Sequence, residues 1–275
     1  MLNDQRVNKF IKEDAKQMEG WFFPSDMVSF YLLDMIQRAM GISGSICEVG
    51  VYHGKSLVRF SLMRREGERL TGYDLFDGEL LSKTQQNLQT FGNPEATELI
   101  KGNTSEFTEQ MLAEKLSDGL RLLHIDAGHE YHEVFQQMLL FAPFVTPGGV
   151  IIMDDYQDRE FPGIEAAVLD FADIDRPRRF VPFFAGGNKM YLCEAHRAVA
   201  YQEALLGTDI LKKQSRVTRV RDFTVLVGFS KLPVDADKCL QNIMMTGFLA
   251  VYEFDHEGLR TKSGRFQQKK FGSGR

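Results

Sequence analysis

The sequence has 275 residues, of which 43% are hydrophobic, and a formal net charge of −5. A chain of this length can bury one substantial core and carry a smaller appended unit. No run approaches the roughly 18 apolar residues of a membrane span, and the polar start MLNDQRVNKF differs from a signal peptide. The acidic balance argues against a nucleic-acid binder. We therefore expect a cytoplasmic protein that binds neither membranes nor nucleic acids.

Residues 1–44 are predicted to form an N-terminal helical segment. Residues 3–19 have a polar helical pattern, and residues 24–40 place apolar side chains at helical spacing. Between these helices lies EGWFFP, residues 19–24, with the single tryptophan. It forms either a lid over a pocket or an ordinary packed aromatic cluster. Helices that precede the first strand do not belong to the sheet, so we expect them to cover one rim of it.

The best-defined motif is SICEVGVYHGKS, residues 45–56. An apolar strand carries Glu48 near its end, Gly50 lets the chain turn, and a helix follows. Open α/β sheets build ligand crevices from this unit, at the carboxyl ends of their strands. A dinucleotide fingerprint starting at Gly50 would need glycines where Tyr52 and Lys55 stand, because the pyrophosphate approaches the backbone there. The motif therefore does not predict a nicotinamide cofactor.

The spacing Glu48-x-Gly50-x-x-x-Gly54 resembles motif I of the class I S-adenosylmethionine (SAM) methyltransferases. In that family the acidic residue lies near the methionine moiety, and the glycines make room for the ligand. Asp74 ends the second predicted strand, 24 residues after Gly50, where a carboxylate can accept both ribose hydroxyls. The resemblance also implies that Asn103 faces the adenine, although Asn-Thr-Ser is ordinary turn chemistry as well.

Repeated strand and helix units with short connections predict a mostly parallel sheet. Strands are expected at residues 46–49, 69–75, 98–101, 120–125, 150–153, 179–184 and 189–194, with helices at 55–65, 79–91, 133–144 and 165–172. The last two strands are joined by a glycine turn and must be antiparallel. The fold class is α/β: a doubly wound, mostly parallel seven-stranded sheet with a terminal antiparallel hairpin. That hairpin distinguishes methyltransferases from dinucleotide-binding folds.

Acidic residues end two neighbouring predicted strands: Asp126 follows the fourth strand, and Asp154 and Asp155 follow the fifth. The carboxyl ends of parallel strands meet at the edge of the sheet where ligands bind. Carboxylates that lie close together raise each other's pKa unless a cation lies among them. Oxygen ligands alone suit Mg²⁺ rather than Zn²⁺. The alternative is that these aspartates only hydrogen-bond their own turns.

Four segments, HIDAGHEYHEV, PGGVIIMDDY, FPGIEAAV and EGWFFPSD, extend the resemblance over residues 19–195. They resemble the macrocin-type small-molecule O-methyltransferases, relatives of catechol O-methyltransferase. In the metal-dependent members, an aspartate after the fourth strand and two residues after the fifth hold the ion, which matches Asp126, Asp154 and Asp155. Some members use a basic residue three positions after the first aspartate as general base, and His129 stands there. The resemblance implies that Asp126 serves cofactor binding, metal binding and catalysis.

The other histidines are weaker candidates. His132 stands three residues after His129, so if both lay on a helix they would share a face and compete for the role of base. His53, in the glycine turn, either contacts the cofactor carboxylate or is an exposed loop residue. His124 and His196 carry no functional signal.

Residues 196–275 form a C-terminal extension that matches no motif, with a helix expected at residues 197–213 and an apolar stretch at 239–254. Residues 212–275 hold 13 Lys and Arg against 6 Asp and Glu, which indicates a solvated basic face or flexible terminus more than a phosphate-binding patch. We expect a substrate cover or a homodimer contact. Cys47, Cys193 and Cys239 lie far apart without a C-x-x-C motif, so we expect buried structural thiols in a reducing compartment.

Residues 45–195 are thus predicted to form a SAM-binding, Rossmann-like catalytic domain. We predict a SAM-dependent O-methyltransferase acting on a hydroxylated small molecule, with Mg²⁺ assistance and His129 as base. One alternative is a metal-independent N- or O-methyltransferase, in which the aspartates only shape the pocket. Another is a SAM-binding protein without turnover. The identity of the methyl acceptor follows from no motif.

Overall fold

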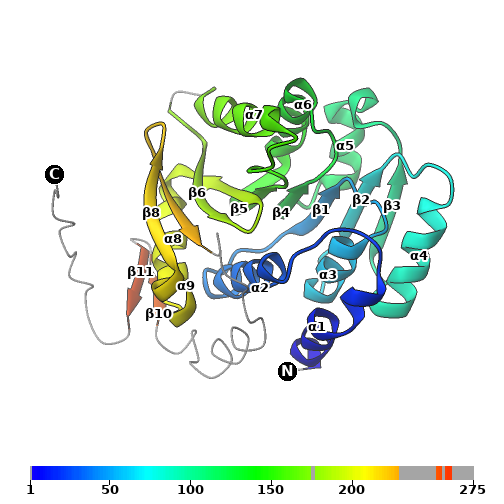
Figure 1. Ribbon diagram of the computed structural model, residues 1–275, viewed down its shortest axis with the longest axis horizontal. Helices are drawn as coiled ribbons and strands as arrows, with labels where there is room; N and C mark the ends of the chain where they lie inside the picture. Colours follow the sequence, from blue (N-terminus) through cyan, green and yellow to red (C-terminus); the bar gives the residue numbers. More distant parts are fainter. Residues whose placement is uncertain (1, 175–176, 229–251, 256–257, 262–275) are drawn as a thin grey trace.

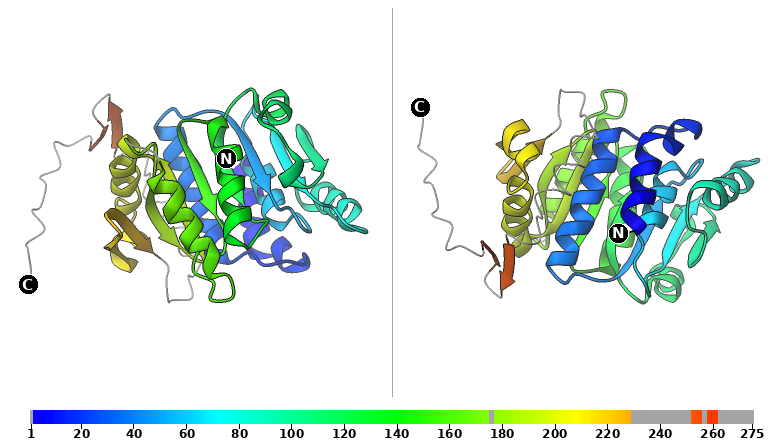
Figure 2. Two further views of the ribbon diagram at one scale, coloured as in Figure 1. Left: turned by 90° about the horizontal axis from the view of Figure 1, so that it is seen from above. Right: turned by 90° about the horizontal axis from the view of Figure 1, so that it is seen from below.

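The computed structural model describes residues 2–174, 177–228, 252–255 and 258–261. Within these residues a nine-stranded sheet, in the order β3-β2-β1-β4-β5-β7-β6-β9-β8, lies between two layers of helices (Figures 1 and 2). Strands β1 to β5 run parallel, and β7 is antiparallel to both β5 and β6. The carboxyl ends of five strands therefore meet at one edge, where ligands bind in such sheets.

The strands are β1 Ser45–Val49, β2 Leu70–Asp74, β3 Thr97–Lys101, β4 Leu120–Ile125, β5 Val145–Met153, β6 Phe180–Gly186, β7 Lys189–Glu194, β8 Ser215–Val220 and β9 Phe223–Gly228. A separate hairpin consists of β10 Tyr252–Asp255 and β11 Gly258–Thr261. The predicted seven-stranded sheet with its antiparallel hairpin is confirmed. Two strands are added to it, because β9 pairs in parallel with β6 and β8 pairs with β9.

The α-helices are α1 Leu2–Lys12, α2 Pro24–Ala39, α3 Lys55–Met63, α4 Leu80–Phe91, α5 Glu109–Leu116, α6 Tyr131–Phe141, α7 Pro162–Asp173, α8 Ala198–Leu206 and α9 Asp209–Gln214. Short 3₁₀ turns are η1 Asp14–Gln17, η2 Thr104–Glu106, η3 Ala142–Phe144 and η4 Ala195–Arg197. One core cluster packs α1 to α3 and α8 against the sheet, and the other packs α5 to α7 against its opposite face. The sheet is therefore covered on both faces, as its continuous apolar strands predict.

A β-bulge in β4 decides which side chains face α2 and α3. Ser45 lies opposite Leu120 and Ile46 opposite Leu122, so Arg121 is an extra residue in the ladder. After the bulge, His124 points toward the rings of Phe30 and Phe60 on those helices. The bulge thus directs Arg121 and His124 to the same face, although strict alternation would separate them.

Several predicted boundaries move for local reasons. Helix α6 starts two residues before the predicted helix, because Glu130 and Glu133 form a capping box. Strand β5 begins before the predicted strand at 150–153, and residues 146–149 lie within it as an irregularity, since pairing with β4 passes from Val145 directly to Val150. The predicted helix at 197–213 is divided into α8 and α9, where the Thr208 hydroxyl caps the second helix.

The first part of the C-terminal extension belongs to the same body as the sheet. Tyr201 of α8 is fully buried and donates a hydrogen bond of 2.6 Å to the carbonyl of Gly148. Cys47 and Cys193 are buried free thiols, as predicted, whereas Cys239 lies outside the described residues. The predicted apolar stretch at 239–254 falls mostly outside them too. The role of the extension as cover or dimer contact stays a prediction.

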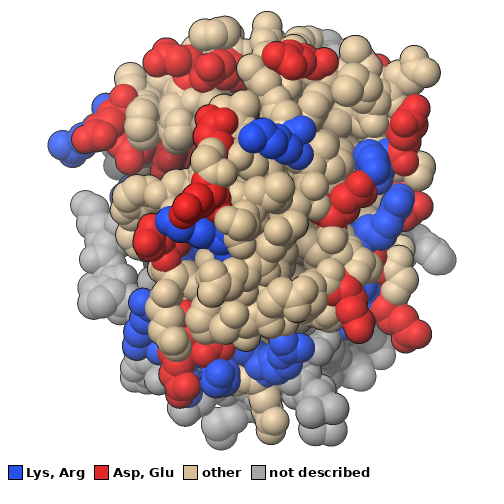
Figure 3. Space-filling model, turned by 90° about the vertical axis from the view of Figure 1, so that its right-hand side faces the viewer, with Lys and Arg blue, Asp and Glu red and all other residues tan. Residues whose placement is uncertain are grey.

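Charged side chains of both signs are spread over the surface seen in Figure 3. On the face seen in Figure 3, Lys and Arg side chains are interspersed with Asp and Glu. That face therefore offers no continuous basic surface to a phosphate backbone. None of the helices in the described part of the chain has the length and apolar character needed to span a bilayer.

Candidate active site

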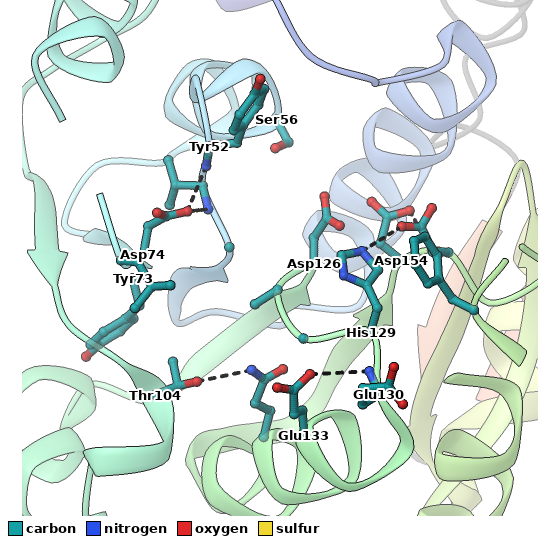
Figure 4. A pocket seen from close by; sticks show the side chains of 18 of the residues that line it. Tyr52, Ser56, Tyr73, Asp74, Thr104, Asp126, His129, Glu130, Glu133 and Asp154 are labelled. Atoms are coloured by element: carbon teal, nitrogen blue, oxygen red, sulfur yellow. Dashed lines mark hydrogen bonds and ion pairs between the residues drawn. The ribbon is translucent and has the colours of Figure 1, made fainter. Parts of the chain in front are cut away.

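A cavity of about 1570 Å³ opens at the carboxyl ends of the parallel strands. The glycine turn after β1, the loops after β2 to β5 and the segment before α2 line it. Figure 4 shows Asp74 on one side of this cavity and Asp126, His129 and Asp154 grouped on the other. The fold therefore joins turns that are far apart in the sequence into one site.

The glycine turn is shaped by close backbone contact. Gly50 has φ +88°, and a Cβ atom there would lie 1.9 Å from the carbonyl oxygen of Asp126. Only glycine fits that approach, which brings the end of β1 against the end of β4. Gly54, with φ +78°, is the residue before α3. Gly50 lines the cavity, whereas Gly54 is not among the described residues that do.

Asp74 lines the cavity and also holds the glycine turn. Its carboxylate accepts hydrogen bonds from the backbone N–H groups of Val51 at 2.7 Å, Tyr52 at 2.9 Å and Phe76 at 2.7 Å. Asn103 lines the cavity as well, while its side-chain oxygen accepts from the N–H of Ser105 and caps η2. Their predicted contacts with ribose and adenine stay predictions.

Glu48 is fully buried and is not among the described lining residues. Its Oε1 lies 2.8 Å from Nδ1 of His124, a residue in which sequence analysis found no signal. Burial raises the pKa of Glu48, against the opposing effect of His124. The predicted contact of Glu48 with SAM stays a prediction, and in this structure the carboxylate faces β4.

His124 continues a chain of buried charges under the cavity. Its Nε2 lies 3.2 Å from Oδ2 of Asp154, which also accepts from Nζ of Lys189. That ammonium lies 3.6 Å from Oδ2 of Asp26 on α2. We call Glu48, His124, Asp154, Lys189 and Asp26 the site network. It connects β1, β4, β5, β7 and α2.

The pKa values within the site network are pushed apart. Burial alone would lower the pKa of His124, but hydrogen bonds to Asp154 and Glu48 raise it to about 9. Burial alone would raise the pKa of Asp154, but Lys189 and His124 hold it far below its usual value. Burial raises the pKa of Asp26 to about 6. Burial and the nearby Asp154 charge raise the pKa of Asp126 well above its usual value.

His129 and Asp155 form the exposed part of the site. His129 Nε2 lies 3.3 Å from Oδ2 of Asp155, and this interaction is the main reason that the pKa of His129 is raised. The imidazole packs on the ring of Phe161, with 4.2 Å between centroids. Asp155 is held by Asn188, whose Nδ2 donates to Oδ1 over 2.8 Å.

Comparison with known proteins bears on this cavity directly. Residues 47–156 match the family model described as a methyltransferase domain. This segment of the chain is thus similar to a methyltransferase domain. The predicted resemblance to class I methyltransferases is confirmed at that level.

An uncharacterized protein of Acanthamoeba polyphaga mimivirus is 29% identical over 141 residues, which are 50% of this chain and 62% of the viral protein. The chain thus spans less than two thirds of that relative. Similar solved structures include CalS11, a TDP-rhamnose 3′-O-methyltransferase of calicheamicin biosynthesis (18% identity, 70% of this chain, 93% of that chain, TM-score 0.48). The O-methyltransferase NovP is similar too (16% identity, 61% of this chain, 80% of that chain, TM-score 0.49). So is an O-methyltransferase from Bacillus cereus in complex with SAH (14% identity, 70% of this chain, 91% of that chain, TM-score 0.49).

The matched segment ends at Tyr156, so it includes the glycine turn, Asp74, Asp126 and both aspartates that follow β5. Asp26, Asn188 and Lys189 complete the site from outside the matched segment. Sequence analysis missed the site roles of all three. A lysine opening an apolar strand is a usable signal, because lysine is almost never fully buried unless it is paired.

The predicted ion site can be tested against these contacts. Oδ2 of Asp154 faces His124 and Lys189, and Oδ1 accepts from the N–H of Asp155. A divalent ion bound to Asp126, Asp154 and Asp155 would have to compete with the Lys189 ammonium. The predicted set does not fit an ion in this arrangement. Among the described residues, the groups with ligand atoms within 4.8 Å of one another are His124, Asp126 and Asp154, and Asp126, His129 and Asp155.

The two remaining histidines lie at different places in the domain. His132 lines the cavity from α6, whereas His129 precedes that helix, so the two do not share a helical face. His53 also lines it, but its side chain is buried and its Nε2 lies 3.2 Å from Oε2 of Glu19. His53 is therefore not an exposed loop residue.

The aromatic segment before α2 divides between packing and the cavity, and its predicted role as a lid stays a prediction. Phe22 is buried against Phe30, as ordinary packing requires. Trp21 is 84% exposed at the cavity and stacks on Tyr52, with 6.1 Å between ring centroids. Lys55 holds this segment in place, because its Nζ donates to the carbonyls of Met18 and Gly20.

Proposed function

We propose that the protein is a SAM-dependent O-methyltransferase that methylates a hydroxyl group of a small molecule, with His129 as general base. One observation carries the proposal: the glycine turn and Asp74 of a methyltransferase domain share a single cavity with the His129–Asp155 pair. A substrate bound in this cavity could therefore contact both the cofactor and the base.

The charge of the site supports a cationic cofactor. Asp126 lies beside the site network, where burial and the nearby Asp154 charge raise its pKa, so a cation bound next to it would favour its ionised form. The sulfonium of SAM carries such a positive charge. The ribose would lie at Asp74, and the methionine moiety at the glycine turn.

The volume of the cavity supports a second, small ligand. About 1570 Å³ exceeds the ~300–1,000 Å³ of ordinary ligand pockets. Room remains beside the cofactor for an acceptor that reaches His129 and Phe161. The acceptor is thus expected to be a small molecule rather than a nucleic acid or a membrane.

His129 would remove the hydroxyl proton as the acceptor oxygen attacks the methyl carbon. The C–O bond forms while the S–C bond breaks, so the residues mainly position the reactants and accept one proton. Asp155 accepts the Nε2–H of a neutral imidazole, which leaves Nδ1 to take the proton. The same carboxylate then stabilises the imidazolium.

Mg²⁺ assistance is a second candidate, favoured by the ligand atoms of Asp126, His129 and Asp155 within 4.8 Å of one another. A bound ion would lower the pKa of the acceptor hydroxyl. His129 would then be a ligand and not the base, so the two versions exclude each other. Activity in EDTA separates them.

The test combines binding and turnover. A thermal-shift series should respond to SAM and S-adenosylhomocysteine but not to NAD, with about 2.7 kcal/mol of stabilisation at a hundredfold excess over Kd. Incubation with SAM and a panel of hydroxylated and amine acceptors should then release S-adenosylhomocysteine with a hydroxylated one. A response to NAD alone contradicts the proposal. SAM binding without turnover on any acceptor indicates a binding protein, and turnover with amines alone indicates N-methylation.

A further inference from the structure

We propose that the turn between β6 and β7, residues 186–189, positions the acceptor end of the site: Lys189 is the permanent counter-ion of Asp154, and Asn188 fixes Asp155. Asp154 is then an anchor of the fold and not an ion ligand. The catalytic meaning of this inference rests on the proposed function, but its contacts do not.

Lys189 is the only lysine among the buried charged side chains of the described residues, and it is 3% exposed. Its ammonium bonds Asp154 and lies 3.6 Å from Asp26. A buried ammonium has no water to replace its partners, so separating it from Asp154 would remove the closest opposite charge of each group. The Lys189–Asp154 pair is therefore part of the folded state.

Asp154 transmits this anchoring to the next residue. Its Oδ1 accepts the N–H of Asp155 at 2.8 Å. Asp155 has φ +52°, in the left-handed region that non-glycine residues rarely adopt. A hydrogen bond to its own backbone N–H stabilises that conformation. The conformation in turn directs the Asp155 carboxylate to His129.

Asn188 holds Asp155 from the opposite side. Its Nδ2 donates to Oδ1 of Asp155 at 2.8 Å, and its side-chain oxygen accepts from Lys189 Nζ at 3.2 Å. Its carbonyl accepts the N–H of Tyr156 at 2.8 Å. Two consecutive residues of one turn thus bind both consecutive aspartates that end β5.

Gly187 lets α2 join this arrangement. It has φ +62°, and a Cβ atom there would lie 1.8 Å from Oδ1 of Asp26. Glycine is required for that approach, and only with it does the Asp26 carboxylate lie beside the ammonium. The turn sequence GNK therefore has a separate contact for each residue.

The first experiment uses Mn²⁺ as the probe, with the full chain. Isothermal titration and electron paramagnetic resonance measure the affinity. If the wild-type protein binds Mn²⁺, we expect Asp154→Asn to bind it with the same affinity, within about threefold. If the wild-type protein does not bind Mn²⁺, we expect Asp154→Asn not to bind it either. Asp155→Asn is the matched comparison, because it removes the neighbouring carboxylate. Loss of wild-type Mn²⁺ binding in Asp154→Asn overturns the inference.

The second experiment is a double-mutant cycle on thermal unfolding. Lys189→Met removes the closest cation of the buried Asp154 and leaves only His124 beside it. We therefore expect the double variant Lys189→Met with Asp154→Asn to unfold at a higher temperature than Lys189→Met alone. The exposed pair Lys115 and Glu98 serves as the control, where the two losses should add. Additive losses at Lys189 and Asp154 contradict the inference. If Lys189→Met does not fold, the Mn²⁺ comparison still decides.

The third experiment tests positioning. Asn188→Ala should keep SAM binding and the unfolding temperature but lose on the order of 10²-fold in kcat, as a misplacement of about 1 Å does. Asn93→Ala, in a turn outside the cavity, is the matched control. Unchanged kcat in Asn188→Ala contradicts the positioning role. The first two experiments need no turnover, so they still decide on the Lys189–Asp154 pair if no methyl acceptor is found.

Discussion

Two buried charge networks lie at opposite ends of the same strands and behave differently. At the amino end of β4, Arg121 binds Glu68, Asp34 and Gln37 and is fully buried. At its carboxyl end, His124 belongs to the site network. We call the first group, together with Arg65, the arginine network.

In the arginine network, each carboxylate is paired with an arginine. The guanidinium of Arg121 grips Glu68 through two hydrogen bonds of 2.7 and 2.9 Å, and Arg65 donates to Asp34 over 2.9 Å. Burial alone would raise the pKa of Asp34, but Arg121, Arg38 and Arg65 lower it. Because arginine does not lose its proton, these charges are fixed at any ordinary pH.

The site network differs in its cations, in its balance of charge and in its contact with the cavity. It uses histidine and lysine as cations, has more carboxylates than cations, and borders the cavity through Asp154. Groups whose pKa values are displaced in opposite directions are typical of functional sites. The comparison teaches that buried charged groups alone do not indicate a functional site. A functional site is indicated by an excess of carboxylates over cations together with contact with a cavity.

The largest expected effect is on catalysis at the cavity. His129→Ala should lower the rate by on the order of 10²–10⁴, the usual contribution of a general base. Its side chain is partly exposed, so the unfolding temperature should not change. His196→Ala, which alters an exposed histidine outside the cavity, is the control. A greater loss in His132→Ala than in His129→Ala would assign the base to His132.

The next effect is on stability at the arginine network. Arg121→Met should lower the free energy of unfolding by about 3–5 kcal/mol, because it removes the closest cation of the buried Glu68 and one of the cations around Asp34. Urea denaturation measures this loss, with exposed Arg216→Met as the control. SAM affinity of the folded protein should remain. A loss below 1 kcal/mol would show that the two networks do not differ as described.

A smaller effect is expected at Asp74, on the far side of the cavity. Asp74→Asn should weaken SAM binding by about tenfold, the value of one good hydrogen bond or somewhat more. Because Asp74 also holds the glycine turn, the amide is preferred to alanine, which would release three backbone N–H groups. Titration calorimetry measures the affinity, and exposed Asp77→Asn is the control. Unchanged affinity contradicts the ribose contact.

The smallest effect is a shift in pH dependence. The pKa of His129 is raised by Asp155, and a base must be neutral to act, so activity should be lost as pH falls through a midpoint above the ordinary 6.5. Asp155→Asn removes the main cause of the raised pKa and should move the midpoint to lower pH. A rate profile of kcat against pH measures both. A midpoint that rises in Asp155→Asn contradicts the pairing.

Much of the fold follows from local sequence. Glu48-x-Gly50-x-x-x-Gly54 predicted the turn after β1, and the apolar runs predicted strands β1 to β7, because periodicity and turn chemistry are properties of neighbouring residues. The same locality predicted that Asp126, Asp154 and Asp155 end adjacent strands. Their convergence at one edge follows from the parallel sheet.

The partners of those carboxylates were decided by tertiary structure. The bulge at Arg121 sets the face on which His124 lies, and the docking of α2 at Gly187 brings Asp26 to Lys189. No local pattern encodes which strand or helix lies beside a buried charge. Since a charge in a low-dielectric interior is neutralised by whatever group the packing brings within a few ångströms, the sequence determined that carboxylates meet at the cavity, and only the packing decided that Asp154 meets an ammonium there.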